Sequence, residues 1–214
     1  EPLVPRYLRL EVDERVLATG EVVTAPDLDD LEPLVREMQD KGIEAVAVTF
    51  LHSYANPTHE RQVAELIGRV APEMRVSISS EVVPEIREYE RTSTTCANVY
   101  VQARVEQYLR ELDRRLRALG FTGQLFVMLS SGGIGTIETA TRFPIRLLES
   151  GPAAGALATA HYGQLIGASD LMSFDMGGTT AKLCVIEKGQ PLTANDFEVD
   201  RIYRFKKGSG LPVK

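Results

Sequence analysis

The chain has 214 residues, of which 43% are hydrophobic and 25% are charged, and its net charge is −6. The length allows one large domain or two small ones. The negative charge argues against a nucleic-acid binder, a class that usually carries a basic stripe, and no apolar run approaches the roughly 20 residues of a membrane span. Two cysteines without a metal or redox spacing, and no recognisable secretory signal, predict a cytoplasmic protein.

The first part of the chain alternates predicted strands and helices. Segment 6–12, "RYLRLEV", alternates apolar and polar residues, as a half-buried strand does. Segment 25–42 has apolar residues at helical spacing, with Asp27 as a cap and Gly42 at its end, so it predicts a helix. Segment 43–51 is almost continuously apolar, which indicates a strand buried on both faces.

A second helix and strand follow at once. Asn56 and Pro57 form a cap and first-turn pair that begins a helix reaching about Val70, and segment 74–79 is predicted as a strand. Strands and helices that alternate over short connections predict an α/β fold with a mostly parallel sheet flanked by helices.

The second half continues with less regular elements. Segment 85–120 is predicted as one long helix that Gly120 ends, and segment 124–130 as a buried strand. Segment 131–136 reads as a turn that begins a short helix, and segment 145–150 as a short strand.

A helix rich in glycine and alanine, residues 151–167, then leads to two strands, 171–175 and 181–189. Between these strands lies "SFDMGGTTAK", residues 173–182. In the dinucleotide-binding fold and in the P-loop a helix follows the glycines. Here residues 183–186 favour a strand, so the sequence predicts a glycine hairpin with Asp175 at the end of its first strand.

Such a hairpin suits a phosphate. Glycines without a Cβ let the backbone N–H groups of residues 177–180 approach phosphate oxygens, and Thr179 and Thr180 add hydroxyl donors. Asp175 beside a polyphosphate implies Mg²⁺ between them, bound mostly through water. Lys182 faces either the phosphates or the solvent. The alternative is a tight turn with no ligand.

Four stretches, "FLHSYANPTHERQVAEL", "EIREYERTSTTCANVYV", "MLSSGGIGTIETATRFPIRLLESGPAAGA" and "FDMGGTTAK", together resemble the hydantoinase A/oxoprolinase family. The resemblance implies an actin-like ATPase (ribonuclease H-like) fold. It further implies that Mg-ATP is used to phosphorylate and open a lactam or imide ring, such as a hydantoin or 5-oxoproline, and that a B-type subunit or domain is a partner. An acetone-carboxylase-type β subunit, which activates ketones, is the alternative within the family.

The resemblance also carries over site residues. Asp175, as catalytic and metal-binding residue, matches the family's second phosphate hairpin together with Gly177, Gly178, Thr179 and Thr180. Gly151 and Pro152 match the turn that begins a helix crossing between two lobes. Gly132 and Gly133, after Ser131, match a glycine turn near the nucleotide cleft. Glu149 stands near the place of a glutamate close to Mg²⁺ in the chaperone ATPases, at a different offset.

Two family stretches allow a structural or a functional interpretation. In "HSYANPTHE" the capping pair begins a helix, while His52 and Tyr54 fix the entering loop. In "EYERTST" the charges of Glu88, Glu90 and Arg91 either line a substrate cleft or fill the first turn of a helix.

The domain organisation follows from the same resemblance. Residues 1–91 are expected to form an α/β subdomain and residues 92–214 part of the ATPase core, with the lobe crossing near 151–167. No D-x-G-G-T hairpin precedes residue 170, so we expect an internal fragment that by itself binds ATP weakly and does not turn it over. A sugar-kinase relative, an actin-like assembly protein and a non-catalytic α/β domain remain as alternatives.

Overall fold

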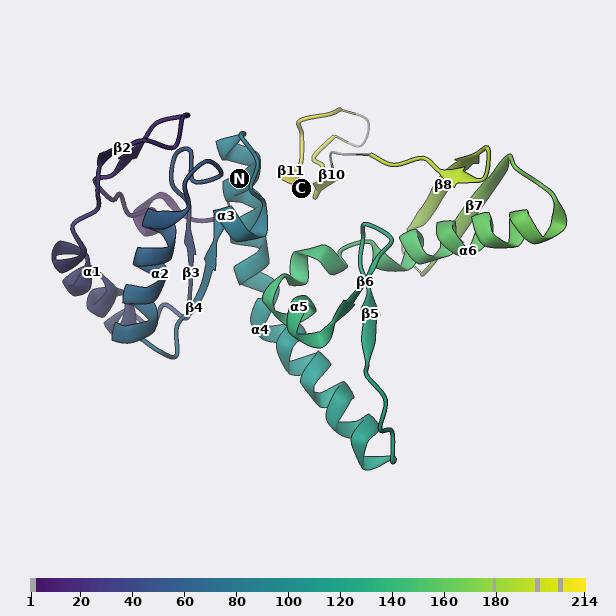
Figure 1. Ribbon diagram of the computed structural model, residues 1–214, viewed down its shortest axis with the longest axis horizontal. Coiled ribbons are helices and arrows are strands. Elements are labelled where there is room, and N and C mark those ends of the chain that lie inside the picture. The colour runs from purple at the N-terminus through teal and green to yellow at the C-terminus, as the bar shows by residue number, and fades with distance from the viewer. Residues whose placement is uncertain (1–2, 179, 195–196, 204–205) are drawn as a thin grey trace. The chain divides into compact units, whose positions relative to one another are not determined.

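The computed structural model describes residues 3–178, 180–194, 197–203 and 206–214 (Figure 1). The chain forms two compact units, residues 1–101 with 196–214 and residues 102–195. The expected division at residue 91 stays a prediction. The fold is mixed α/β, built from small sheets of two or three strands.

The first unit combines helices with short strands. In chain order its elements are η1 (Arg6–Leu8), β1 (Arg15–Val16), β2 (Val22–Thr24), α1 (Leu28–Asp40), β3 (Ala45–Val48), α2 (Thr58–Val70), β4 (Arg75–Ile78), α3 (Ser79–Val82), the beginning of α4 (Glu88–Ala118), β10 (Phe197–Val199) and β11 (Leu211–Val213). β3 and β4 form the one parallel pair among the described residues, with Ala45 opposite Arg75 and Val48 opposite Ile78.

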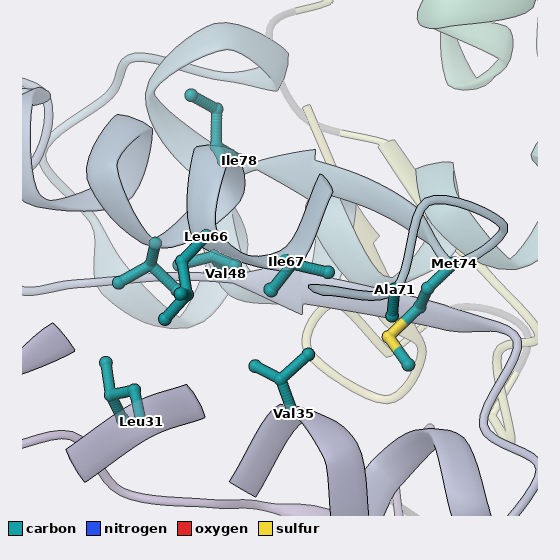
Figure 2. Close-up of a cluster of buried hydrophobic side chains, with 9 residues drawn as sticks. Leu31, Val35, Val48, Leu66, Ile67, Ala71, Met74 and Ile78 are labelled. Carbon is teal, nitrogen blue, oxygen red and sulfur yellow. The ribbon is translucent and has the colours of Figure 1, made fainter. Parts of the chain in front are cut away.

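The core of this unit lies between α1, α2 and the β3–β4 pair. Figure 2 shows Leu31 and Val35 of α1 facing Leu66 and Ile67 of α2, with Val48 of β3 beside them. Ile67 is 1% exposed and Val35 is 2% exposed. Burying a side chain of this size stabilises a fold by about 1.5–3 kcal/mol, so these contacts hold the two helices on the sheet.

The predicted capping of both helices is confirmed. The Asp27 carboxylate accepts the N–H groups of Asp29 and Asp30 at 3.0 and 3.3 Å, which satisfies two of the free donors at the beginning of α1. The Asn56 side chain accepts the Thr58 N–H at 3.1 Å in the same way at the beginning of α2.

The predicted strand over residues 6–12 is wrong. Arg6–Leu8 forms a short 3₁₀ helix instead, and the first strand is Arg15–Val16, paired with β2. Pro5 directly precedes the 3₁₀ helix. A proline fixes its own φ, which suits a turn, and among the described residues no strand pairs with segment 6–12.

The second unit is a series of hairpins and short helices. It contains the rest of α4, β5 (Phe126–Met128), β6 (Ile134–Thr136), α5 (Ile137–Arg142), η2 (Pro144–Leu147), α6 (Ser150–Ile166), β7 (Leu171–Met176), β8 (Ala181–Glu187) and β9 (Gln190–Pro191). α4 is 31 residues long and carries charge along its length. Within the described residues, no helix has the length and apolar character that crossing a membrane requires.

The expectation of a mostly parallel sheet is wrong for the described residues. β5 pairs with β6, β7 with β8 and β8 with β9, and all of these pairs are antiparallel. The connections are too short for anything else, because a parallel pair needs a crossover of a dozen or more residues. The strand predicted over 145–150 is also wrong, since Pro144 begins the 3₁₀ helix η2 there.

The helix predicted over 151–167 is confirmed as α6, and it packs along β7 and β8 (Figure 1). Its small residues make that contact. A Cβ added at Gly163 would come within 2.4 Å of Leu171 Cδ1, and Ala156 and Ala160 are buried beside it. Close packing on the hairpin therefore accounts for the small residues at Ala156, Ala160 and Gly163. The other face of the hairpin exposes Met172, Phe174, Leu183 and Val185.

Candidate functional site

Asp175 and Lys182 lie opposite each other across the β7–β8 hairpin, two residues before and after its glycine turn. Every second residue of a strand points to the same face. Asp175 therefore shares a face with Ser173, and Lys182 shares a face with Ile186. Ser173 and Ile186 are both buried. This is the face that packs against α6, so the two charged side chains point toward that helix and not into open solvent.

Lys182 pairs with Glu149 at the beginning of α6 through its Nζ atom and the Glu149 Oε2 atom. Glu149 occupies the N-cap position of α6 with a φ of 63°, in the left-handed region, and its side chain makes no capping hydrogen bond. The sequence left open whether Lys182 faces a phosphate or the solvent. In this structure its ammonium pairs with the Glu149 carboxylate.

The first turn of α6 is held in place by the preceding segment. Ser130, after β5, donates both its N–H and its hydroxyl to the carbonyl of Arg146, at 2.7 and 2.8 Å. Arg146 lies three residues before Glu149. No side chain caps α6, so no capping side chain occupies the N–H groups at the positive end of its dipole, an end that suits an anion.

Three of the predicted site glycines have no internal reason to be glycine. A Cβ added at Gly151, Gly177 or Gly178 would meet no atom from elsewhere in the described structure within 4 Å. None of the three has a φ in the left-handed region, so any residue could adopt their backbone conformation. Open space over an exposed turn is what a close-approaching ligand needs.

The turn itself offers fewer donors than the sequence indicated. The Gly177 N–H donates to the Thr180 carbonyl at 3.0 Å and closes the hairpin, so it is not free for a phosphate. Thr180 is exposed. Thr179, also predicted as a site residue, lies outside the described residues.

Gly132 and Gly133 lie at the β5–β6 turn and have internal roles. Gly132 has a φ of 85°, and a Cβ added there would come within 3.1 Å of Leu157 Cδ1 on α6. The Gly132 N–H and the Gly133 carbonyl both bond to Leu129, at 3.0 and 2.8 Å. Turn geometry and packing therefore explain the first of these glycines without a ligand.

The site fits Mg²⁺ in the way that phosphate-linked sites do. Among the described residues no cluster of three acidic, histidine or cysteine side chains could enclose a metal ion by itself. Mg²⁺ keeps most of its waters and is bound through one or two carboxylates together with phosphate oxygens. Asp175 is half-buried and has no ion pair with any other described residue, so its carboxylate could serve as one such ligand.

Two of the other candidate residues, Arg91 and His52, make internal hydrogen bonds. The Arg91 side chain is 1% exposed and donates to the carbonyls of Phe50 and Glu85, at 2.6 and 3.2 Å. His52 Nδ1 bonds to the Val16 carbonyl at 2.8 Å, which supports its loop-fixing interpretation. Glu88 is exposed at the beginning of α4.

Two important residues were missed or given little weight in the sequence. Glu60 is fully buried and bonds to three groups at the ends of β3 and β4; a charged residue within the helical pattern of "HERQVAEL" is a weak signal for such a role. The partnership of Glu149 with Lys182 joins residues far apart in the chain, and no local pattern indicates it.

Two solved structures of enzymes described as ATP-dependent resemble this mixed α/β fold. An acetone carboxylase in its nucleotide-free structure matches with a TM-score of 0.79 and 27% identity, over 89% of this chain and 27% of that one. The ATP-dependent caprolactamase of Pseudomonas jessenii matches with a TM-score of 0.75 and 28% identity, over 86% and 26%. An uncharacterised protein of Methanocaldococcus jannaschii is 42% identical over all of this chain and 32% of its own length.

The chain belongs to the hydantoinase/oxoprolinase family. The family model described as "Hydantoinase/oxoprolinase" matches residues 91–213, and the one described as its N-terminal region matches residues 1–71. The family expectation is therefore confirmed. The chain spans about a third or less of the length of the curated relatives it matches, at 32%, 30% and 26%.

Proposed function

We propose that the chain is part of an ATP-dependent enzyme that opens a cyclic amide, a lactam or an imide, with Mg-ATP bound at the β7–β8 turn. The observation that carries the proposal is the set of three glycines, Gly151, Gly177 and Gly178, that neither packing nor backbone conformation requires. Gly151 lies in the uncapped first turn of α6, and Gly177 and Gly178 follow Asp175, a carboxylate without an ion pair among the described residues. Two of the similar structures are of ATP-dependent enzymes.

Each residue has a role in this proposal. Asp175 holds Mg²⁺ mostly through water, and Gly178 with Thr180 lets the turn approach the phosphates. The N–H groups at Ser150 and Gly151 face anionic oxygens, and Lys182 adds a positive charge nearby. When bound, ATP supplies a phosphoryl group that converts an amide carbonyl oxygen into a leaving group; the protein's task is to position that group and balance its charge.

The finer description of the fold is part of the same proposal. Residues 92–214 would belong to an actin-like (ribonuclease H-like) ATPase core, with α6 as the helix that crosses between lobes, and residues 1–91 to an α/β subdomain. A B-type subunit or domain is the proposed partner, because caprolactamase and acetone carboxylase relatives are named as subunits. Ketone activation, as in acetone carboxylase, is the second candidate; the similarity to that structure supports it no better than the similarity to caprolactamase supports a cyclic amide.

The test uses the full-length protein with its partner subunit. ATP hydrolysis is measured with Mg²⁺ in the presence of 5-oxoproline, a hydantoin, caprolactam and acetone in turn. Turnover stimulated by a cyclic amide supports the proposal, and stimulation by acetone alone supports the second candidate. Asp175→Ala should remove the stimulated turnover.

Glu187→Ala is the matched control, because it removes an exposed carboxylate from the far end of β8. It should leave turnover unchanged. Equal turnover in the wild type and in Asp175→Ala would show that the glycine hairpin is only a turn.

A further inference from the structure

We propose that Glu149 is a positioning residue for Lys182: it holds the lysine ammonium away from Asp175, so that the Asp175 carboxylate stays free for a cation. The inference rests on the proposed function, because it assumes that Asp175 binds Mg²⁺ with a nucleotide. It concerns a residue to which the family resemblance assigns no such role.

The geometry gives Lys182 a choice of two carboxylates. Asp175 is its direct cross-strand neighbour, and the Cβ atoms of such neighbours lie about 4.5–5.5 Å apart. The four-carbon stem of a lysine spans that gap easily. The structure nevertheless pairs the ammonium with Glu149 and leaves Asp175 without an ion pair among the described residues.

The backbone at Glu149 indicates that its side chain has a definite task. A φ of 63° is a conformation that glycine adopts freely and a side chain with a Cβ adopts at a cost. Glutamate at an N-cap position usually contributes little, and this one makes no capping bond. The Glu149 side chain contacts Lys182. We therefore infer that the strained backbone at Glu149 serves to place its carboxylate beside Lys182.

The placement of Lys182 has a second consequence. The beginning of a helix carries partial positive charge, which repels a cation. The Lys182 ammonium is stable near this helix beginning because Glu149 balances its charge. A phosphate at the same place would balance it equally well, so Lys182 can exchange Glu149 for a phosphate oxygen when a nucleotide binds, without passing through a bond to Asp175.

Removing the charge of Glu149 should redirect Lys182. In Glu149→Gln the Lys182 ammonium loses its carboxylate partner and pairs with Asp175 instead. Mg²⁺ must then compete with the ammonium for the Asp175 carboxylate. Binding of ADP to the full-length protein is followed by calorimetry over a range of Mg²⁺ concentrations. The Mg²⁺ concentration for half-maximal ADP binding should rise about tenfold, as expected when a cation settles beside a carboxylate.

The double variant Glu149→Gln/Lys182→Met gives the decisive comparison. With no ammonium to compete, the Mg²⁺ dependence should equal that of Lys182→Met alone, so that Glu149→Gln has no further effect, which a merely structural role for Glu149 would not produce. Lys182→Met alone is the reference for this comparison, because Lys182 is itself proposed to bond to a phosphate oxygen and its loss changes nucleotide binding. Lys188→Met, at the far turn of the hairpin, controls for loss of a charge.

Two results would overturn the inference. One is an unchanged Mg²⁺ dependence in folded Glu149→Gln. The other is a double variant whose Mg²⁺ requirement is raised as much as that of Glu149→Gln. Asp175→Asn separates this failure from that of the proposed function. If Asp175→Asn loses Mg²⁺-dependent binding while Glu149→Gln does not, the positioning role alone falls. If Asp175→Asn binds Mg-ADP as the wild type does, the proposed site falls as well.

Discussion

The carboxylate of Glu60 accepts the backbone N–H of Ser80 at 2.8 Å. The same carboxylate also accepts the Phe50 N–H at 2.9 Å and the Ser79 hydroxyl at 2.5 Å. One side chain of α2 thereby joins the segments that follow β3 and β4. The carboxyl ends of parallel strands are where ligands often bind, but here a buried side chain of the protein itself occupies those donors.

Glu60→Ala should therefore lower the free energy of unfolding by about 3 kcal/mol, because it leaves buried donors without an acceptor. The measurement is urea denaturation followed by circular dichroism. Glu65→Ala is the matched control, since Glu65 is an exposed glutamate of the same helix, and it should change stability by less than about 0.5 kcal/mol. Equal changes in the free energy of unfolding of the two variants would contradict the structural role of Glu60.

Gly163→Ala should destabilise the contact between α6 and β7. The added methyl group would meet Leu171 Cδ1 at 2.4 Å and the Ala168 carbonyl oxygen at 2.8 Å, and overpacking of this kind costs about 1–3 kcal/mol. Gly155→Ala is the control, because its Cβ would meet Ser173 Oγ at 3.7 Å, an ordinary contact. Thermal unfolding should show a lower midpoint for Gly163→Ala only.

Gly178→Ala separates ligand binding from stability. Its Cβ would enter open space, so unfolding should change by less than about 0.5 kcal/mol. In the proposed site the methyl group would stand where a phosphate approaches, and a forced contact of about 1–3 kcal/mol weakens nucleotide binding about tenfold or more.

Gly189→Ala should show the opposite pattern. Gly189 has a φ of 76° at the other turn of the sheet, so alanine there is strained by about 1–2 kcal/mol while the glycine turn near Asp175 is untouched. Loss of stability with normal nucleotide binding is expected. Normal nucleotide binding by Gly178→Ala would contradict the assignment of this turn to a phosphate.

The segment between β10 and β11 should respond to acid. The Gly208 N–H, which donates to the Glu198 carboxylate at 2.8 Å, together with the Gly210 N–H and Arg201, holds the pKa of Glu198 below its usual value. The stabilisation is therefore present above the unfolded pKa of about 4.3 and is lost as the pH falls through the lower folded value.

Nuclear magnetic resonance provides the check on that segment. The amide signals of Gly208 and Gly210 should stay constant from pH 7 to pH 5 and move together below pH 4.3, the ordinary pKa of a glutamate. In Glu198→Gln the same signals should not titrate in this range. Signals in the wild type that move between pH 7 and pH 5 would contradict the lowered pKa.

The long helices could be predicted from sequence because each carries its own local signals. α1 has a cap at Asp27 and a glycine at Gly42, and both are found in those roles. The short strands could not be predicted in the same way. Segments 6–12 and 145–150 have suitable residues for strands, but a strand exists only when a partner pairs with it, and prolines next to both segments favour 3₁₀ turns.

The hairpin was predictable from its glycines, but the ion pair beside it was not. "DMGGTT" between two apolar runs indicated the hairpin, and β7 pairs with β8 around it. Lys182 pairs with Glu149 and not with its cross-strand neighbour Asp175, and this depends on where α6 begins in space. A left-handed backbone at a glutamate leaves no trace in the sequence, since glycine is the residue that normally signals it.

The central claim is that Asp175 holds Mg²⁺ beside a nucleotide, and calorimetry of Mg-ADP binding to full-length wild type and Asp175→Asn tests it most directly. The account predicts that the variant binds Mg-ADP at least about tenfold more weakly, the loss typical of a residue that binds a metal through water. With Mg²⁺ removed by a chelator the two proteins should bind ADP alike. Equal Mg-ADP affinity in the two folded proteins would contradict the account.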